Sequence, residues 1–112
     1  MSTLADRDCV PCKGGVPPLK GEKLQEISKQ LAHPEKWKII GEHHIVRSSK
    51  FTDFKSALAF VNRVGAIAEE QGHHPDINLA WGKVEITIWT HAIDGLTESD
   101  FILAAKIEQI ET

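Results

Sequence analysis

The chain has 112 residues, of which 41% are hydrophobic and 26% charged, and its formal net charge is −3 at pH 7. This length is enough for one domain with one modest core. The negative charge disfavours nonspecific nucleic-acid binding, which needs an excess of Lys and Arg on one face. No apolar run approaches the roughly 20 residues that cross a bilayer, and no signal-peptide core follows Met1. We therefore expect a cytoplasmic protein with neither a nucleic-acid nor a membrane partner.

Residues 1–20 are predicted to form an extended N-terminal arm ahead of a domain spanning 21–112. The arm carries a lone Cys-x-x-Cys pair, Cys9 and Cys12, followed by glycines and prolines that are typical of irregular structure. Such a pair could be half of a zinc site or a redox couple, but no matching second pair occurs, and an exposed tail with two reduced thiols is the favoured interpretation. Because Pro and Gly leave little apolar surface to bury, removal of residues 1–18 is expected to leave fold and activity nearly intact.

The first half of the domain shows helical, then strand, then helical patterning. Apolar residues at helical spacing predict a helix over residues 21–32, ended by the His33-Pro34 pair. Two short strands are predicted over 37–42 and 44–48. Thr52 is predicted to be the N-cap of a second helix, and Gly72 its left-handed C-cap. The apolar stripe of this helix, which Phe60 and Ile67 widen, comprises Phe54, Ala57, Leu58, Val61, Val64 and Ala68.

The second half reads as a hairpin followed by a helix. Apolar residues alternate on both sides of Gly82, which predicts a hairpin over residues 76–90. A last helix over 98–110 begins after Thr97, with Asp100 completing a variant of the capping box. This helix is apolar almost all round, so we expect a partner subunit to cover one side of it. The order α-β-β-α-β-β-α predicts an α+β fold, a four-stranded antiparallel sheet with helices packed on one face.

Three histidines are the candidate functional residues. His73 and His74 follow the second helix, and His91 ends the second hairpin strand, so antiparallel pairing brings them together. On that strand Trp89 and His91 face away from the valine and isoleucine side chains. An imidazole has an unperturbed pKa of roughly 6.5 and transfers protons near neutral pH. Catalysis, metal binding and a structural role remain open on spacing alone.

The neighbouring ionisable residues are assigned different expectations. Glu69 lies at the negative end of a helix dipole, which disfavours a carboxylate by about 0.3–1 kcal/mol unless an imidazole lies nearby. His33 is expected to face solvent at a helix end. His43 and His44 are adjacent in a strand or turn, where side chains point in opposite directions, so at most one is expected to belong to any site.

The same residues resemble the signature of the pterin-4a-carbinolamine dehydratase family. The matching positions, in register, are Glu69, His73, His74, Pro75, Trp81, His91 and Asp100. The surrounding segments PDINLAWGKVEITIWTH, GLTESDFILAAKIE and FTDFKSALAFVNRV are also similar to the family, and the resemblance covers roughly residues 22–110. The arm CVPCKGGVPPL resembles the start of bacterial members.

The resemblance implies dehydration of a 4a-hydroxytetrahydropterin to the quinonoid dihydropterin, which recycles the pterin of aromatic amino-acid hydroxylases. It implies no cofactor and no metal, a homo-oligomer (dimer or tetramer), and a possible hydroxylase partner in the same pathway. It further implies catalytic roles for His73, His74 and His91. The substrate-binding residues would be Gly72, His73, His74, Trp89, Thr90, His91 and Ala92, and the supporting residues Glu69, Asp100 and Trp37.

Two positions depart from the family pattern. Gly72 stands where some members carry Asp, and Ser99 where some carry Arg, so an opposite-charge pair is lost and substrate preference could differ. Two other classes of function stay open. One is a non-catalytic assembly or dimerisation factor of the same fold, and the other a metal-binding domain that uses Cys9, Cys12 and the His73-His74 pair.

Overall fold

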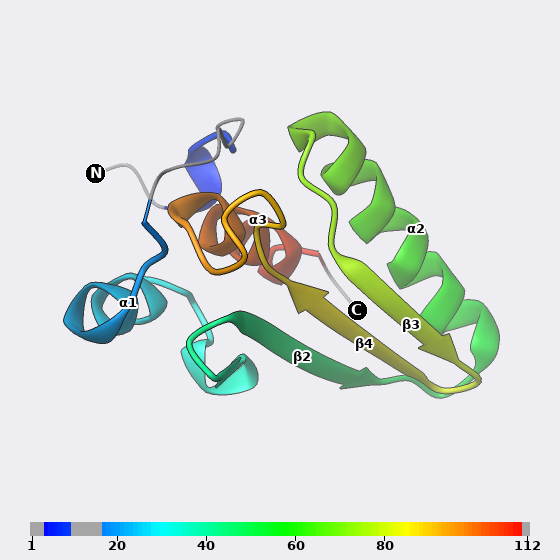
Figure 1. The fold of residues 1–112 in the computed structure, drawn as a ribbon. Helices are drawn as coiled ribbons and strands as arrows, with labels where there is room; N and C mark the ends of the chain where they lie inside the picture. Colours follow the sequence, from blue (N-terminus) through cyan, green and yellow to red (C-terminus); the bar gives the residue numbers. More distant parts are fainter. Residues whose placement is uncertain (1–3, 10–16, 111–112) are drawn as a thin grey trace.

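The computed structural model describes residues 4–9 and 17–110, and it confirms the predicted α+β class and the order of the helices and strands. Two short 3-10 helices add to the prediction. The elements, drawn in Figure 1, are η1 (Leu4–Asp6), α1 (Gly21–Ser28), η2 (Pro34–Lys36), β1 (Lys38–Ile40), β2 (His44–Lys50), α2 (Phe54–Gln71), β3 (Asp76–Ala80), β4 (Lys83–Ile88) and α3 (Glu98–Glu108). Helix α1 is shorter than predicted, because the backbone after Ser28 tightens into i→i−3 hydrogen bonds.

The four strands form one antiparallel sheet in the order β1-β2-β4-β3. Strand β2 pairs with β4 in a register that sets Ile45 opposite Ile88, and β3 pairs with β4 along the predicted hairpin. On β4, Val84, Ile86 and Ile88 are buried on one face of the sheet, while Glu85 and Thr87 on the other face are partly exposed. Helices α2 and α3 cover the buried face (Figure 1), so the predicted alternation on β4 is confirmed.

The ends of α2 follow ordinary capping chemistry, with one correction. Asp53, and not Thr52, is the N-cap, since its Oδ1 accepts the backbone N–H of Ser56 at 2.7 Å. This hydrogen bond lowers the pKa of the Asp53 carboxyl. At the other end, Gly72 adopts φ 64° and ψ 27°, which confirms the predicted left-handed C-cap.

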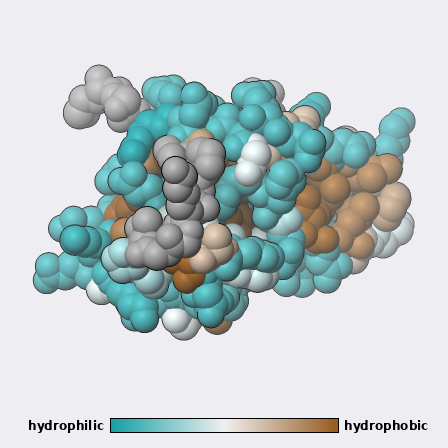
Figure 2. Space-filling view, turned by 45° about the horizontal axis from the view of Figure 1, so that its top comes forward, coloured by the Kyte–Doolittle hydropathy of each residue, from teal (hydrophilic) through white to brown (hydrophobic). Residues whose placement is uncertain are grey.

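The buried face of α2 is rotated from the predicted stripe. The side chains it buries are Ala57, Phe60, Val64 and Ala68. Phe54 and Leu58, which belong to the predicted stripe, are 44% and 39% exposed, and Trp81 in the β3–β4 turn is 69% exposed. Figure 2 shows hydrophobic side chains gathered on the right of that view, the side of the molecule that α2 occupies in Figure 1. Apolar surface therefore remains on α2.

Helix α3 is buried within the single chain, so the expectation that a partner subunit covers one side of it was wrong. Leu103 and Ile107 are at most 1% exposed, and seven consecutive residues from Ser99 to Ala105 are buried. The segment 4–9 supplies part of this cover, since η1 packs on α3. Leu4 is itself 2% exposed. Residues 4–9 thus differ from the expected extended arm, which was predicted to bury little apolar surface. Cys12, the other cysteine of the predicted pair, lies outside the described residues.

Among the described residues, no helix is long and apolar enough to cross a membrane.

Candidate active site

The predicted histidines surround one open pocket of about 310 Å³. Two chain segments form it, the exit of α2 and the end of β4, and antiparallel pairing of β3 with β4 holds them side by side. The lining residues are Gly72, His73, His74, Trp89, Thr90, His91 and Ala92. The structure thus brings together all seven residues that the family resemblance implies for substrate binding.

His73 is tied to a buried carboxylate. Its Nε2 lies 2.6 Å from Oδ1 of Asp100, and the two side chains are 14% and 0% exposed. The second carboxylate oxygen of Asp100 accepts hydrogen bonds from the Thr97 backbone N–H and the Thr90 hydroxyl, both at 2.8 Å. A buried carboxylate is stable only when such partners replace water. Asp100 therefore completes the capping box of α3 and also orients the His73 ring.

His74 makes a similar contact in a different environment. Its Nε2 lies 2.6 Å from Oε1 of Glu69, with the side chains 60% and 79% exposed. Glu69 occupies the last turn of α2, where the helix dipole disfavours a carboxylate, and the imidazole beside it offsets that effect. The prediction that an imidazole lies near Glu69 is confirmed.

His91 lies against an aromatic side chain. Its ring is parallel to that of Trp89, with a centroid separation of 4.2 Å and an interplanar angle of 11°. Both residues project from the outer face of the sheet, as strand alternation predicted, while Thr90 between them is 4% exposed. Stacking restricts the orientation of the His91 ring at the edge of the pocket.

A second histidine pair lies beside Trp89, and sequence reasoning missed it. The rings of His43 and His44 lie 5.7 and 6.1 Å from the Trp89 ring, and their Nδ1 atoms are 3.0 Å apart. His43 Nε2 also contacts Asp94 Oδ1 at 2.7 Å. Neither histidine lines the pocket, so the expectation that at most one of them belongs to the site is not contradicted. Both rings lie near Trp89 because His43 lies in the turn that begins at Gly41 and Glu42, both with positive φ. The β2–β4 register, unknown from the sequence, was the missing signal.

Trp37, expected to support the site, does not line this pocket. It is 6% exposed and belongs to the hydrophobic core, with the Arg47 guanidinium 5.8 Å from its ring centroid. Burial lowers the pKa of Arg47, and the charge of Glu108 opposes that effect. His33, by contrast, is exposed as predicted.

The arrangement is suited to proton transfer. Three imidazoles face one pocket, and each has a different partner: a buried carboxylate for His73, an exposed carboxylate for His74 and an aromatic ring for His91. Positioned imidazoles act as general acids and bases near neutral pH. No group of three or more His, Cys, Asp or Glu side chains within residues 4–9 and 17–110 is arranged to hold a metal ion.

Comparison with known proteins gives a consistent result. The family model described as pterin 4 alpha carbinolamine dehydratase matches residues 18–110. A protein of Rubrobacter xylanophilus, provisionally named pterin-4-alpha-carbinolamine dehydratase, is 59% identical over 98% of this chain and 100% of its own length. A similarly named protein of Alkaliphilus metalliredigens is 50% identical over 97% of this chain and 96% of its own length.

The fold is also similar to solved structures. A crystal structure described as a transcriptional coactivator/pterin dehydratase from Brucella melitensis matches with a TM-score of 0.73 and 33% identity, over 81% of this chain and 95% of that one. A pterin dehydratase-like protein, identified as a RuBisCO assembly factor in the alpha-carboxysome, matches with a TM-score of 0.56 and 25% identity, over 65% of this chain and 86% of that one. On the family match and these identities, the chain belongs to the pterin 4 alpha carbinolamine dehydratase family.

Proposed function

We propose that this protein dehydrates a 4a-hydroxytetrahydropterin to the quinonoid dihydropterin. The observation that carries the proposal is the pocket in which His73, His74 and His91 meet, with His73 bound to the buried Asp100. In this reaction the bond from C4a to the hydroxyl breaks and a double bond forms between C4a and N5. One proton must reach the departing hydroxyl, and another must leave N5. Two imidazoles can perform both transfers.

The partners of the histidines favour a division of roles. The Nε2 of His73 is engaged with Asp100, so Nδ1 is the nitrogen left to take the proton from N5. The buried carboxylate stabilises the imidazolium that forms, as carboxylates do in other acid–base sites. His91, across the pocket, would deliver the proton to the hydroxyl. His74 is adjacent to His73 but projects to solvent toward Glu69, which favours contact with the pterin or the leaving hydroxyl.

Single and double substitutions test these roles. His73→Ala and His91→Ala should each lower the turnover number by about 10²-fold or more, with the overall fold retained. The double variant should lose less than the product of the two, since acid and base act in one elimination. His33→Ala, which removes an exposed histidine outside the pocket, is the matched control. A stopped-flow dehydration assay in which both single variants keep near-full turnover would refute the proposal.

The alternative is a non-catalytic assembly factor of the same fold. The likeness to a RuBisCO assembly factor favours considering it. The three histidines of the pocket have no evident use in such a role, which supports the enzyme. Assay of the purified wild-type protein separates the two functions, because an assembly factor would not accelerate dehydration above the spontaneous rate.

We further propose a homo-oligomer, a dimer or tetramer, whose interface includes Phe54, Leu58 and Trp81. Phe54 and Leu58 are one helical turn apart on α2, and a backbone hydrogen bond from Phe51 to Gly82 holds the β3–β4 turn beside the start of that helix. Leu58→Asp should then dissociate the oligomer, because an unpaired charge is costly to bury. Sedimentation equilibrium that gives a monomer for the wild type at micromolar concentration would contradict this assembly.

We propose that the protein acts in the cytoplasm, with an aromatic amino-acid hydroxylase in the same pathway.

A further inference from the structure

The His73–Asp100 contact joins two elements that are not continuous in the chain. His73 follows the C-terminal end of α2, whereas Asp100 lies in the first turn of α3, 27 residues later. The 2.6 Å separation of Nε2 and Oδ1 therefore depends on how the two helix ends lie relative to each other. Any group that bonds to both ends helps to set that distance.

The N-terminal segment, residues 4–9, bonds to both ends. The backbone N–H of Cys9 donates to Oε1 of Gln71 at 2.8 Å, and Gln71 is the last residue of α2, two before His73. The Cys9 thiol lies 3.4 Å from the carbonyl oxygen of Ser99, the residue that directly precedes Asp100. One residue of the segment thus contacts the immediate neighbours of both members of the pair.

Gln71 is the central contact on the α2 side. While its Oε1 accepts from Cys9, its Nε2 donates to Oδ1 of Asp8 at 3.3 Å. The carboxamide is therefore held at both ends, and the side chain is only partly exposed. A glutamine bonded in this way fixes the C-terminal end of α2 relative to residues 8 and 9.

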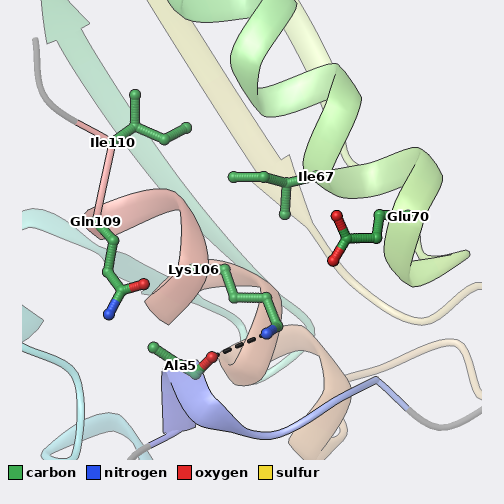
Figure 3. A pocket seen from close by; sticks show the side chains of 6 residues that line it. All are labelled: Ala5, Ile67, Glu70, Lys106, Gln109 and Ile110. Carbon is green, nitrogen blue, oxygen red and sulfur yellow. Dashed lines mark hydrogen bonds between the residues drawn. The ribbon is translucent and has the colours of Figure 1, made fainter.

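The rest of the segment is attached to α3. Leu4 is 2% exposed in the core, and Lys106 Nζ donates to the carbonyl oxygen of Ala5 at 2.8 Å. Figure 3 shows this contact at one side of a pocket of about 260 Å³, across which Ile67 and Glu70 project from α2. Arg7 pairs with Glu98, the first residue of α3, at 2.8 Å. The segment is thus fixed along α3 before it reaches Gln71.

We propose that residues 4–9 act as a strap that holds the His73–Asp100 pair in register, with Gln71 as a positioning residue for the reaction. The expected effect of the strap on the reaction rate rests on the proposed function, whereas its effect on the orientation of the His73 ring does not. Catalytic groups lose much of their effect when displaced by about 1 Å, which can cost on the order of 10²-fold in rate. The strap precedes the family match, which begins at residue 18.

The geometric consequence is tested by nuclear magnetic resonance of the imidazole nitrogens. In the wild type, the ¹⁵N signals of His73 should report one tautomer with the proton on Nε2, held by Asp100. Gln71→Ala should broaden or shift these signals and leave those of His33 unchanged. Gln25→Ala, an exposed glutamine of α1, is the matched control. Unchanged His73 signals in a folded Gln71→Ala protein would overturn the strap, whatever the activity.

The catalytic consequence is tested by kinetics. Gln71→Ala should lower kcat by about 10-fold while KM changes by less than about 2-fold, because ring orientation and not substrate contact is lost. Gln71→Met keeps the length of the side chain but neither hydrogen bond, so it should give the same loss as Gln71→Ala. It also replaces Gln71→Ala in both experiments if that variant does not fold. An inactive wild type would refute the proposed function alone; equal kcat values for wild type and a folded Gln71 variant would refute the positioning role.

Discussion

Two adjacent histidines make the same contact in opposite environments. His73 and His74 each hold a carboxylate oxygen 2.6 Å from Nε2, but the first pair is 14% and 0% exposed and the second 60% and 79%. Exposed pairs are screened by water and salt and typically contribute about 0–1 kcal/mol. A buried carboxylate cannot exchange its partners for water, so the loss of one partner leaves it unsatisfied. The contact distance therefore does not tell which pair contributes more to stability and activity, whereas the burial of the pair does.

The largest expected effect comes from replacing the buried carboxylate. Asp100→Asn should lower kcat by about 10²-fold or more, because a neutral amide does not stabilise the His73 imidazolium. Glu69→Gln makes the same chemical change on the exposed pair and should lower kcat by less than about 3-fold, consistent with the weak energetics of exposed pairs. Stopped-flow dehydration measures both, with circular dichroism to verify folding. Equal losses in the two variants would show that burial does not distinguish the two carboxylates.

Double-mutant cycles on stability compare the buried and the exposed histidine–carboxylate pairs directly. Removing His73, Asp100 or both should give a coupling free energy of about 1.5–3 kcal/mol, the range for hydrogen bonds to charged groups. The corresponding cycle for His74 and Glu69 should give about 0–1 kcal/mol. Urea unfolding supplies the free energies. A coupling for the exposed pair as large as that for the buried pair would mean that burial is not the governing difference.

His74→Ala should have a smaller effect on activity than the changes at Asp100. Because this side chain is exposed and held only by Glu69, we expect a change of less than about 10-fold, mainly in KM. Steady-state rates over a range of pterin concentrations separate kcat from KM. A loss in kcat comparable to that of His73→Ala would show that His74 itself acts as the acid or the base.

The smallest expected effect concerns Asp53, an exposed carboxylate held by a backbone N–H instead of an imidazole. Its pKa is lowered by the hydrogen bond from Ser56, so the folded state binds this proton less tightly than the unfolded chain. The stabilisation is fully present above the unfolded pKa and is lost as the pH falls through the folded pKa. Asp53→Ala should therefore lower the stability slightly at pH 7 and leave it unchanged in strong acid. A pH-independent difference in unfolding curves would rule out this cap as its cause.

The sequence predicted the site better than it predicted the packing around it. Hairpin pairing alone indicated that His73 or His74 would lie near His91, and the capping pattern pointed to Thr97 and Asp100. Neither pattern indicated that Asp100 would be buried and bound to His73, since a cap is a local feature and this contact spans 27 residues. The His43–His44 pair beside Trp89 was likewise out of reach, because it depends on the pairing of β2 with β4.

Local chemistry in the sequence therefore determined the element order, the left-handed cap at Gly72, the alternation along β4 and the nearness of His73 or His74 to His91; the full set of pocket residues came from the resemblance to the family. These properties depend on backbone sterics and on residues a few positions apart. Only the tertiary structure decided which apolar faces are covered. It buried α3 within one chain, partly by means of residues 4–9, and it left Phe54 and Leu58 exposed. A residue is buried only when another segment packs against it. The residues next to it in the sequence do not reveal which segment that will be.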